Sequence, residues 1–296
     1  MVAEIARGHH TVPRFYLNGF ADEDHRIGVV RLPGDTRYQQ STTKVSVVND
    51  FYNVNAAVEQ DVIEKFIADE IEAPAAAVFR KVLADQVWPL DTNDRTILST
   101  FFGLQHRRGP NQRRMLNEIA NAVAREGSLD TQNTAKPDES ELFKLAHIRS
   151  MLDIEKYGGY YFGRSWMLVR FNRKRLLTCD TPVILLPHPD APADATVGIG
   201  TAWAILFPLS RITGLMMFQH LTGEPHDVVS GHFDTTAEGS THLAEQFNAA
   251  TIRNARECIF HHPDDASLVP AELPEPRYDE LSTSHPPREP VQTEQG

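Results

Sequence analysis

The chain shows two kinds of hydrophobic pattern. Between residues 58 and 157, apolar residues recur every three or four positions, which is the period of amphipathic helices. On either side, short apolar runs are separated by Asn, Asp, Gly and Pro, as is typical of strands joined by turns. The expected strands are residues 27–32, 44–48, 51–54, 166–171, 175–178, 183–186, 203–207, 215–218 and 257–260.

Two further helices are expected outside this central region. Val12, Phe15, Tyr16 and Phe20 recur at helical spacing, and Pro13 suits the first position of this helix because its missing N–H is not needed there. The other helix is expected at residues 237–254. Helices in the middle and strands at both ends predict an α+β fold. In this fold a mixed or antiparallel sheet, built from N- and C-terminal strands, packs against a central group of long helices.

The C-terminal segment differs in composition from the rest. Residues 264–296 contain eight acidic residues, two arginines and six prolines, and therefore hold −6 of the formal net charge of −11. Segments with few apolar residues and high charge do not bury enough surface to fold. We therefore expect one α+β domain at residues 1–263, with its helical part at about 58–157, and a disordered acidic tail at 264–296.

Composition narrows the class of protein. The remaining charge of −5 predicts no broad binding to duplex DNA. There is no apolar run of about 18 residues, so no membrane span is expected, and the N-terminus lacks a secretory signal pattern. Cys179 and Cys258 have no metal-ligand spacing, which favours the reducing cytoplasm.

His9 and His10 stand directly before the first expected helix. Imidazole titrates near neutral pH and is a common metal ligand, so His10 is a candidate general acid or base. The alternative is a simple helix start, with one ring packed and the other in solvent. The sequence favours this alternative for both residues, and more strongly for His9.

A basic segment ends the helix expected from about residue 91. Gln105 and Arg108 lie on the helix face that buries Phe101, so both should point inward. A buried guanidinium needs a carboxylate, a phosphate or a cavity. Arg108 is therefore a candidate catalytic anion clamp, with Gln105 and Arg107 as candidate substrate-binding residues. The alternatives are a structural pair with an acid such as Asp180, or a solvated basic face.

Asp180 follows an expected strand and precedes a Thr-Pro pair. An aspartate at a strand end can orient a histidine, bind a metal or cap a turn, and the turn cap is the commonest of these. Nothing around the neighbouring Cys179 predicts a lowered thiol pKa, so we exclude it as a nucleophile.

Other signatures of chemistry are weak or missing. The spacing of the histidines between residues 220 and 242 matches no zinc signature, and we interpret them as histidines of loops without a metal. These residues are His220, His226, His232 and His242, with Asp227 and Asp234. The chain has no Walker loop, dinucleotide fingerprint, G-x-S-x-G elbow or H-E-x-x-H motif, which argues against cofactor-dependent classes.

Several segments together resemble the bacterial domain-of-unknown-function family 4238. They are His10-Thr11-Val12-Pro13-Arg14-Phe15-Tyr16-Leu17 with Phe20, Asn49-Asp50-Phe51-Tyr52, Ile63-Glu64, Ile71-Glu72, Gln105 with Arg108 and Pro110, Cys179-Asp180-Thr181-Pro182-Val183, Phe207-Pro208-Leu209-Ser210, and Asn248. The resemblance covers roughly residues 8–262. Thr11 and Cys179 depart from it, since an aromatic residue and a serine are common at these positions. The resemblance implies no activity, but it adds Asn248 as a candidate substrate-binding residue.

These observations lead to three functional hypotheses. The first is a hydrolase of a phosphate-containing substrate, a nucleotide or RNA, with His10, Arg108 and Asp180 as catalytic residues. The second is a non-enzymatic binding or interaction protein of a bacterial defence or toxin system, in which Arg108 and Asp180 form a structural pair. The third is an enzyme that uses a divalent metal at His10 and Asp180.

Overall fold

The computed structural model describes residues 8–52, 62–110, 112–114, 139–192, 197–219 and 233–277. The helical elements are α1 (Arg14–Leu17), η1 (Asn18–Phe20), α2 (Val62–Phe66), η2 (Ile67–Glu72), α3 (Ala73–Leu83), α4 (Thr92–Arg107), α6 (Glu139–Leu152), α7 (Ile154–Phe162), α9 (Thr241–Asn254) and η3 (Pro263–Leu268). η2 is a π-helix, whereas η1 and η3 are 3-10 helices. Every helix in these ranges is too short or too polar to cross a lipid bilayer.

The strands of the described ranges form three sheets. The strands are β1 (Gly8–His10), β2 (Arg26–Arg31), β3 (Thr36–Ser41), β4 (Val47–Asn49), β5 (Ser165–Arg170), β6 (Thr178–Cys179), β7 (Ile184–Leu186), β8 (Ala204–Ser210), β9 (Thr213–Phe218), β10 (Thr235–Glu238) and β11 (Cys258–His261). The sheet orders are β1-β4, β10-β5-β9-β8-β7 and β3-β2-β11-β6. All neighbouring strands are antiparallel except β10 and β5. The third sheet joins N-terminal and C-terminal strands, and the predicted α+β fold is confirmed.

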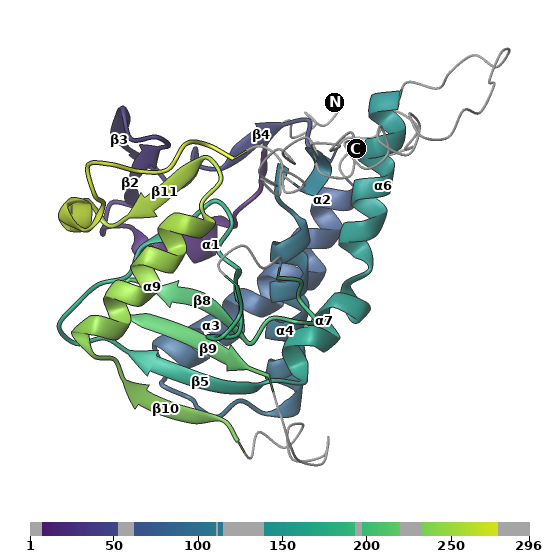
Figure 1. The fold of residues 1–296 in the computed structure, drawn as a ribbon. Helices are drawn as coiled ribbons and strands as arrows, with labels where there is room; N and C mark the ends of the chain where they lie inside the picture. Colours follow the sequence, from purple (N-terminus) through teal and green to yellow (C-terminus); the bar gives the residue numbers. More distant parts are fainter. Residues whose placement is uncertain are drawn as a thin grey trace, which may run out of the picture.

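The five-stranded sheet is covered by helices on both faces. Phe207 of β8 lies 4.7 Å from Phe102 of α4, measured between ring centroids. The next residue of β8, Pro208, is opposite Gly214 of β9, and a Cβ on Gly214 would lie 2.8 Å from the ring of Phe247 on α9. Because neighbouring strand residues point to opposite faces, α4 and α9 pack on opposite sides. Figure 1 shows α9 crossing one face of this sheet, with α3 and α4 at the other.

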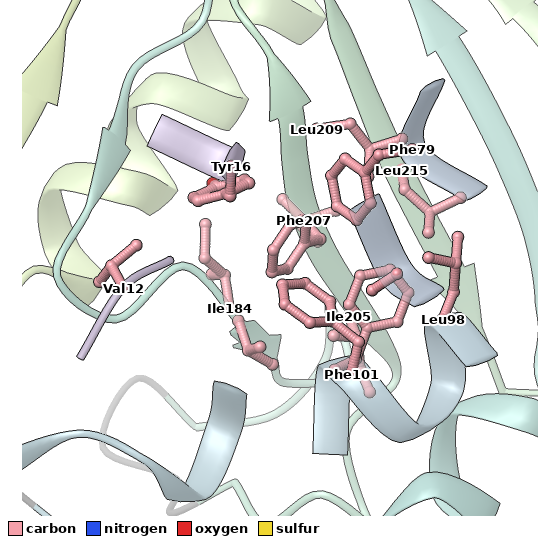
Figure 2. Packing of buried hydrophobic residues seen from close by; sticks show 14 of the residues in the cluster. Val12, Tyr16, Phe79, Leu98, Phe101, Ile184, Ile205, Phe207, Leu209 and Leu215 are labelled. Carbon is pink, nitrogen blue, oxygen red and sulfur yellow. The ribbon is translucent and has the colours of Figure 1, made fainter. Parts of the chain in front are cut away.

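Tyr16 of α1 connects the two larger sheets. Its hydroxyl donates a hydrogen bond to the carbonyl of Pro208 in β8 at 2.8 Å and shares one with Thr178 of β6 at 2.6 Å. The ring centroid of Tyr16 lies 5.1 Å from that of Phe207, and Figure 2 shows both side chains within the cluster of buried hydrophobic residues. Burial strongly raises the pKa of this phenol, so it remains protonated and available as a donor. The opening segment is thus part of the core, as its apolar content predicts.

Several elements differ in detail from the expected ones. The strand expected at 51–54 does not form at Phe51 and Tyr52, because the Tyr52 N–H donates to the His9 side chain and not to a neighbouring strand, and residues 53 and 54 lie outside the described residues. The helix expected at 237–254 begins at Thr241, because residues 235–238 pair with β5 as strand β10. The strands β3 and β10 were not predicted, because their residues are mostly polar and exposed and show no apolar alternation. The helical region changes from the π-helix η2 to α3 between Glu72 and Ala73, and Pro74 lies in the first turn of α3, where it costs no hydrogen bond. Residues 115–138 of the helical region expected at about 58–157 lie outside the described residues.

Ordered structure continues beyond the expected domain end at residue 263. The 3-10 helix η3 begins at Pro263, and Arg211 holds it through two hydrogen bonds to the carboxylate of Asp265, at 2.6 and 2.9 Å. Val269 is buried in a small cluster with strand residues. The first part of the expected disordered tail, residues 264–277, is therefore folded onto the domain. Residues 278–296 lie outside the described residues.

The close crossing of α4 and α7 generates a test of this packing. A Cβ on Gly103 of α4 would lie 3.0 Å from the backbone nitrogen of Gly158 in α7. We expect Gly103→Ala to lower the free energy of unfolding by about 1–3 kcal/mol, because backbone atoms have no room to move aside. Urea unfolding measures this change.

Gly159→Ala is the matched control, since a Cβ there meets no atom within 4 Å. This variant should be neutral or stabilising by up to about 1 kcal/mol, because alanine is the better helix former. Equal destabilisation by both substitutions would contradict the packing.

Candidate functional site

The C-terminal end of α4 presents a polar group to the interior. Asp91 is the N-cap of α4, and its side chain accepts a hydrogen bond from the backbone N–H of Asp94. Its apolar face then buries Phe101, and one and two turns later the same face buries Gln105 and Arg108, which are 4% and 0% exposed. The inward direction predicted for these two residues is what the structure shows.

The acid that pairs with Arg108 is Glu72, the last residue of the π-helix η2, and not Asp180. Nη1 of Arg108 donates to the Glu72 carboxylate, and Nε donates to the hydroxyl of Tyr52 at 2.5 Å. Burial alone would lower the pKa of Arg108, but Tyr52, Glu72 and Glu64 together raise it above its ordinary value. The guanidinium is therefore charged, and Glu72 balances its charge.

The two histidines of β1 have different environments. His9 is fully buried, stacks on Tyr52 with ring centroids 5.2 Å apart, and accepts a hydrogen bond at Nδ1 from the Tyr52 backbone N–H at 3.0 Å. His10 is half-buried, and its Nδ1 lies 3.1 Å from the carbonyl oxygen of Val45. Since a carbonyl only accepts, Nδ1 of His10 carries the hydrogen and Nε2 keeps its lone pair. Nε2 has no hydrogen-bond partner among the described residues.

Burial, and then the charged groups nearby, favour the neutral form of the His10 ring. Burial and then Arg108 lower the pKa of His10, against the opposing effects of the Val45 carbonyl and Glu72. Arg14, the first residue of α1, adds to this lowering and is itself exposed. The structure thus brings His10 together with Arg108 and places an exposed cation, Arg14, within electrostatic range of the imidazole.

Two buried acceptor atoms in this region have no hydrogen-bond partner among the described residues. They are Oε1 of Gln105 and Oε2 of Glu64 in α2. The other end of the Gln105 amide, Nε2, donates to the carbonyl of Thr11 at 2.9 Å, next to His10. Buried polar atoms without partners are uncommon and often mark functional sites.

Two further candidate residues are engaged by structural partners. Arg107 donates hydrogen bonds to Gln112 at 3.0 Å and to Ser150 of α6 at 2.7 Å. Asn248 of α9 accepts from the backbone N–H of Leu177 and donates to the carbonyl of Arg175, both at 2.9 Å. Both side chains therefore join an element to its neighbour, and a substrate-binding role for either stays a prediction.

The carboxylate of Asp180 accepts hydrogen bonds from the backbone of the segment before β11. Its two carboxylate oxygens accept hydrogen bonds from the N–H groups of Arg256 and Glu257, at 3.0 and 2.9 Å. Burial raises the pKa of Asp180 to about 6, although these N–H groups favour the charged form. The segments of Asp180 and Arg108 are neighbours, since a Cβ on Gly109 would lie 3.9 Å from Thr181. However, no described interaction of the Asp180 side chain involves His10 or Arg108.

The remaining candidates do not form a site within the described residues. Burial raises the pKa of the Cys179 thiol far above its ordinary value, in agreement with its exclusion as a nucleophile. No group of three or more His, Cys, Asp or Glu residues in the described ranges is placed to hold a metal ion. His242 is exposed, and Asp234 pairs with Arg95 instead of a histidine. His220, His226, His232 and Asp227 lie outside the described residues.

Four residues of this region were not among the candidates chosen from the sequence. They are Arg14, Tyr52, Glu64 and Glu72. Each belongs to a segment of the family resemblance, so the signal was present in the sequence. What the sequence does not contain is the distance between these segments, which decides that Glu72 and not Asp180 reaches Arg108.

The structural role of Asp180 is testable by substitution. Asp180→Ala leaves the N–H groups of Arg256 and Glu257 without their acceptor, and we expect it to lower the free energy of unfolding by about 1–3 kcal/mol. Asp190→Ala, at an exposed carboxylate near His188, is the control and should change stability by less than about 0.5 kcal/mol. Similar unfolding curves for the two variants would contradict the role.

Comparison with known proteins agrees with the resemblance seen in the sequence. A search of curated proteins and a search of solved structures found no match. The family model described as "Protein of unknown function (DUF4238)" matches residues 8–265. Because this match covers most of the 296 residues, the chain belongs to the DUF4238 family.

Proposed function

We propose that this protein is a hydrolase of phosphate-containing substrates, with His10 as the general base and Arg14 as the residue that holds the phosphate. The observation that supports the proposal is the open Nε2 of a half-buried, neutral imidazole. The Val45 carbonyl fixes this ring from its other side, in the way that a second partner orients a catalytic histidine. Asp180 has no part in the proposal, because backbone N–H groups occupy both of its oxygens.

The proposed reaction uses Nε2 of His10 and the guanidinium of Arg14. Nε2 of His10 takes a proton from water while the water oxygen attacks phosphorus, and the bond from phosphorus to the leaving oxygen breaks. Arg14 binds a non-bridging oxygen with its planar fork of N–H groups. Arg108 is enclosed, so it acts as a positioning residue that holds Glu72 and keeps His10 neutral.

The balance of charge favours a singly charged substrate. Arg108 and Glu72 neutralise each other as an ion pair, which leaves Arg14 as the other cation that acts on His10 in the described part of the chain. One guanidinium matches the single charge of a phosphodiester better than the double charge of a phosphate monoester. We therefore propose a phosphodiester, as in RNA or a cyclic or linked nucleotide.

Removal of the base should abolish hydrolysis. We expect the protein to hydrolyse bis-para-nitrophenyl phosphate or a fluorogenic RNA oligonucleotide, and His10→Ala to lower kcat by about 100-fold or more. Arg14→Ala should mainly raise KM for both substrates, because it removes a contact to the phosphate. Release of nitrophenol or fluorescence measures both parameters.

Two exposed residues serve as controls. His188→Ala and Arg173→Ala remove an imidazole and a guanidinium outside the region of His10 and should leave kcat and KM unchanged. Hydrolysis that is absent from the unmodified protein, or that is equal in His10→Ala and His188→Ala, would overturn the proposal.

A non-enzymatic interaction protein is the second candidate function. The observation that favours it is the complete burial of Arg108, whose pair with Glu72 has the character of a structural ion pair. Asn248, Arg107 and Asp180 also have internal partners. In a non-enzymatic interaction protein, these polar residues would stabilise the fold, and a partner would bind to a different surface.

The strength of the Arg108 pair is measurable by a double-mutant cycle. Arg108→Met or Glu72→Gln alone should lower the free energy of unfolding by about 3–5 kcal/mol, because the remaining partner stays enclosed without its counter-charge. The double variant should lose less than the sum of the two. The exposed pair of Arg114 and Glu257 is the control, with an expected coupling within about 1 kcal/mol. A coupling for Arg108 and Glu72 as small as the control would contradict the structural pair.

A further inference from the structure

The outer edge of the four-stranded sheet is formed by β3, a six-residue strand that is open to solvent. It pairs with β2 residue by residue from Thr36 to Ser41, without a bulge. Its first four residues are exposed, and Tyr38 among them is 37% exposed, with its hydroxyl at Arg31 of β2. Figure 1 shows β3 at the periphery of the molecule. The outward backbone groups of such a strand can pair with a further strand.

The hydrogen bonds to β2 show which backbone groups of β3 point outward. Just beyond the two strands, the N–H of Thr42 donates to the carbonyl of His25 at 2.9 Å. Residue pairs that exchange hydrogen bonds alternate with pairs that do not in antiparallel strands. The backbone groups of Arg37, Gln39 and Ser41 therefore point away from β2. Among the described strands, β3 pairs with β2 alone.

Two of the outward carbonyl groups have a contact within the chain. The carbonyl of Gln39 accepts a long hydrogen bond of 3.4 Å from the exposed guanidinium of Arg26. The carbonyl of Ser41 accepts from the N–H of Lys44 at 2.9 Å, which closes a turn. In the described part of the chain, both backbone groups of Arg37 and the N–H of Gln39 are left without a backbone partner.

The other edges of the two larger sheets are short or protected. At the edge formed by β6, the N–H of Leu177 donates to the side chain of Asn248 at 2.9 Å. At the edge formed by β10, the indole of Trp88 donates to the carbonyl of Thr235 at 2.9 Å. The last edge strand, β7, has only three residues. β3 is thus the longest edge strand of these sheets.

β3 also lacks the features by which edge strands avoid pairing, which are proline, a bulge and outward charges. Its one charged residue is Arg37. The guanidinium of Arg37 is turned back to its own chain, where it donates to the carbonyls of Gly34 at 3.2 Å and Pro270 at 2.7 Å. The middle of the edge, at Tyr38 and Gln39, is uncharged.

We propose that β3 pairs in antiparallel fashion with β3 of a second copy of this chain, about a two-fold axis at Tyr38. This inference does not depend on the proposed hydrolase. In this register Arg37 lies opposite Gln39 of the second copy and exchanges two hydrogen bonds with it, and the two-fold axis repeats this pair. The backbone groups used are those that lack a backbone partner, together with the weakly engaged carbonyl of Gln39.

The same register places the two Tyr38 residues directly opposite each other. They form a pair without hydrogen bonds, in which the Cα atoms approach to about 4.5 Å and aromatic side chains stabilise the strands. The two four-stranded sheets become one continuous sheet, and the interface is closed by its symmetry. A contact along one strand is small, so we expect a reversible equilibrium between one and two copies.

Sedimentation equilibrium of the full chain tests the association. The apparent mass should rise from 33.3 kDa toward twice this value as the protein concentration increases. Gln39→Pro removes an outward N–H and no bond to β2, and should weaken association by about 10-fold or more. Gln39→Thr keeps the N–H and is the matched control, with unchanged association. A constant mass of one chain, or equal association of both variants, would overturn the proposal.

A charge exchange at Tyr38 tests the two-fold axis and the identity of the second strand. Tyr38→Lys and Tyr38→Glu each place like charges opposite one another, so each variant alone should keep the mass of one chain. An equal mixture of the two should associate again, because Lys then faces Glu. This exposed position lets the test stand even where Gln39→Pro fails to fold. If the separate variants associate as the unmodified protein does, or if their mixture does not associate, pairing about Tyr38 is wrong.

Discussion

Burial of the Arg108 charge is the constraint on which the candidate site depends. The side chain lies at the end of a helix whose apolar face continues to it without interruption, so the fold of α4 sends a guanidinium into the interior. Such a charge is stable only with a counter-charge and hydrogen-bond acceptors around it. Tyr52 and Glu72 supply these from two segments far away in the sequence. The site is therefore assembled by the need to satisfy one arginine.

The N-terminal end of α4 also buries an arginine together with its counter-charge. Arg95, one turn into the helix, is fully buried and pairs with Asp234, and its guanidinium lies 4.3 Å from the ring centre of Trp166. It also donates to the carbonyls of Phe162 and Arg164. These contacts fix α4 to β5, to the end of α7 and to the segment before β10. A helix held at both ends by buried ion pairs keeps the groups at its C-terminal end in constant positions.

The sequence predicts some features of this site and not others, for a physical reason. The inward direction of Gln105 and Arg108 follows from helical period, which is a property of neighbouring residues, and it could be predicted. The identity of the acid that meets Arg108 depends on how α2, η2 and α4 pack, and Asp180 was the wrong choice. The polar strand β3 was likewise missed, because its pairing with β2 and not its own composition makes it a strand.

Exposure finally separates the roles of residues that look alike in the sequence. Arg14 and Arg108 both act on His10, yet one guanidinium is exposed and the other is 0% exposed. An enclosed arginine that already binds a carboxylate contributes a fixed field, whereas an exposed one is free to meet a ligand that arrives from solvent. The same distinction applies to His9, which is fully buried, and to His10, which is half-buried and whose Nε2 has no hydrogen-bond partner among the described residues. In the proposed hydrolase, the exposed Arg14 and the half-buried His10 therefore take part in the chemistry. The buried Arg108 and His9 hold the surrounding segments in place.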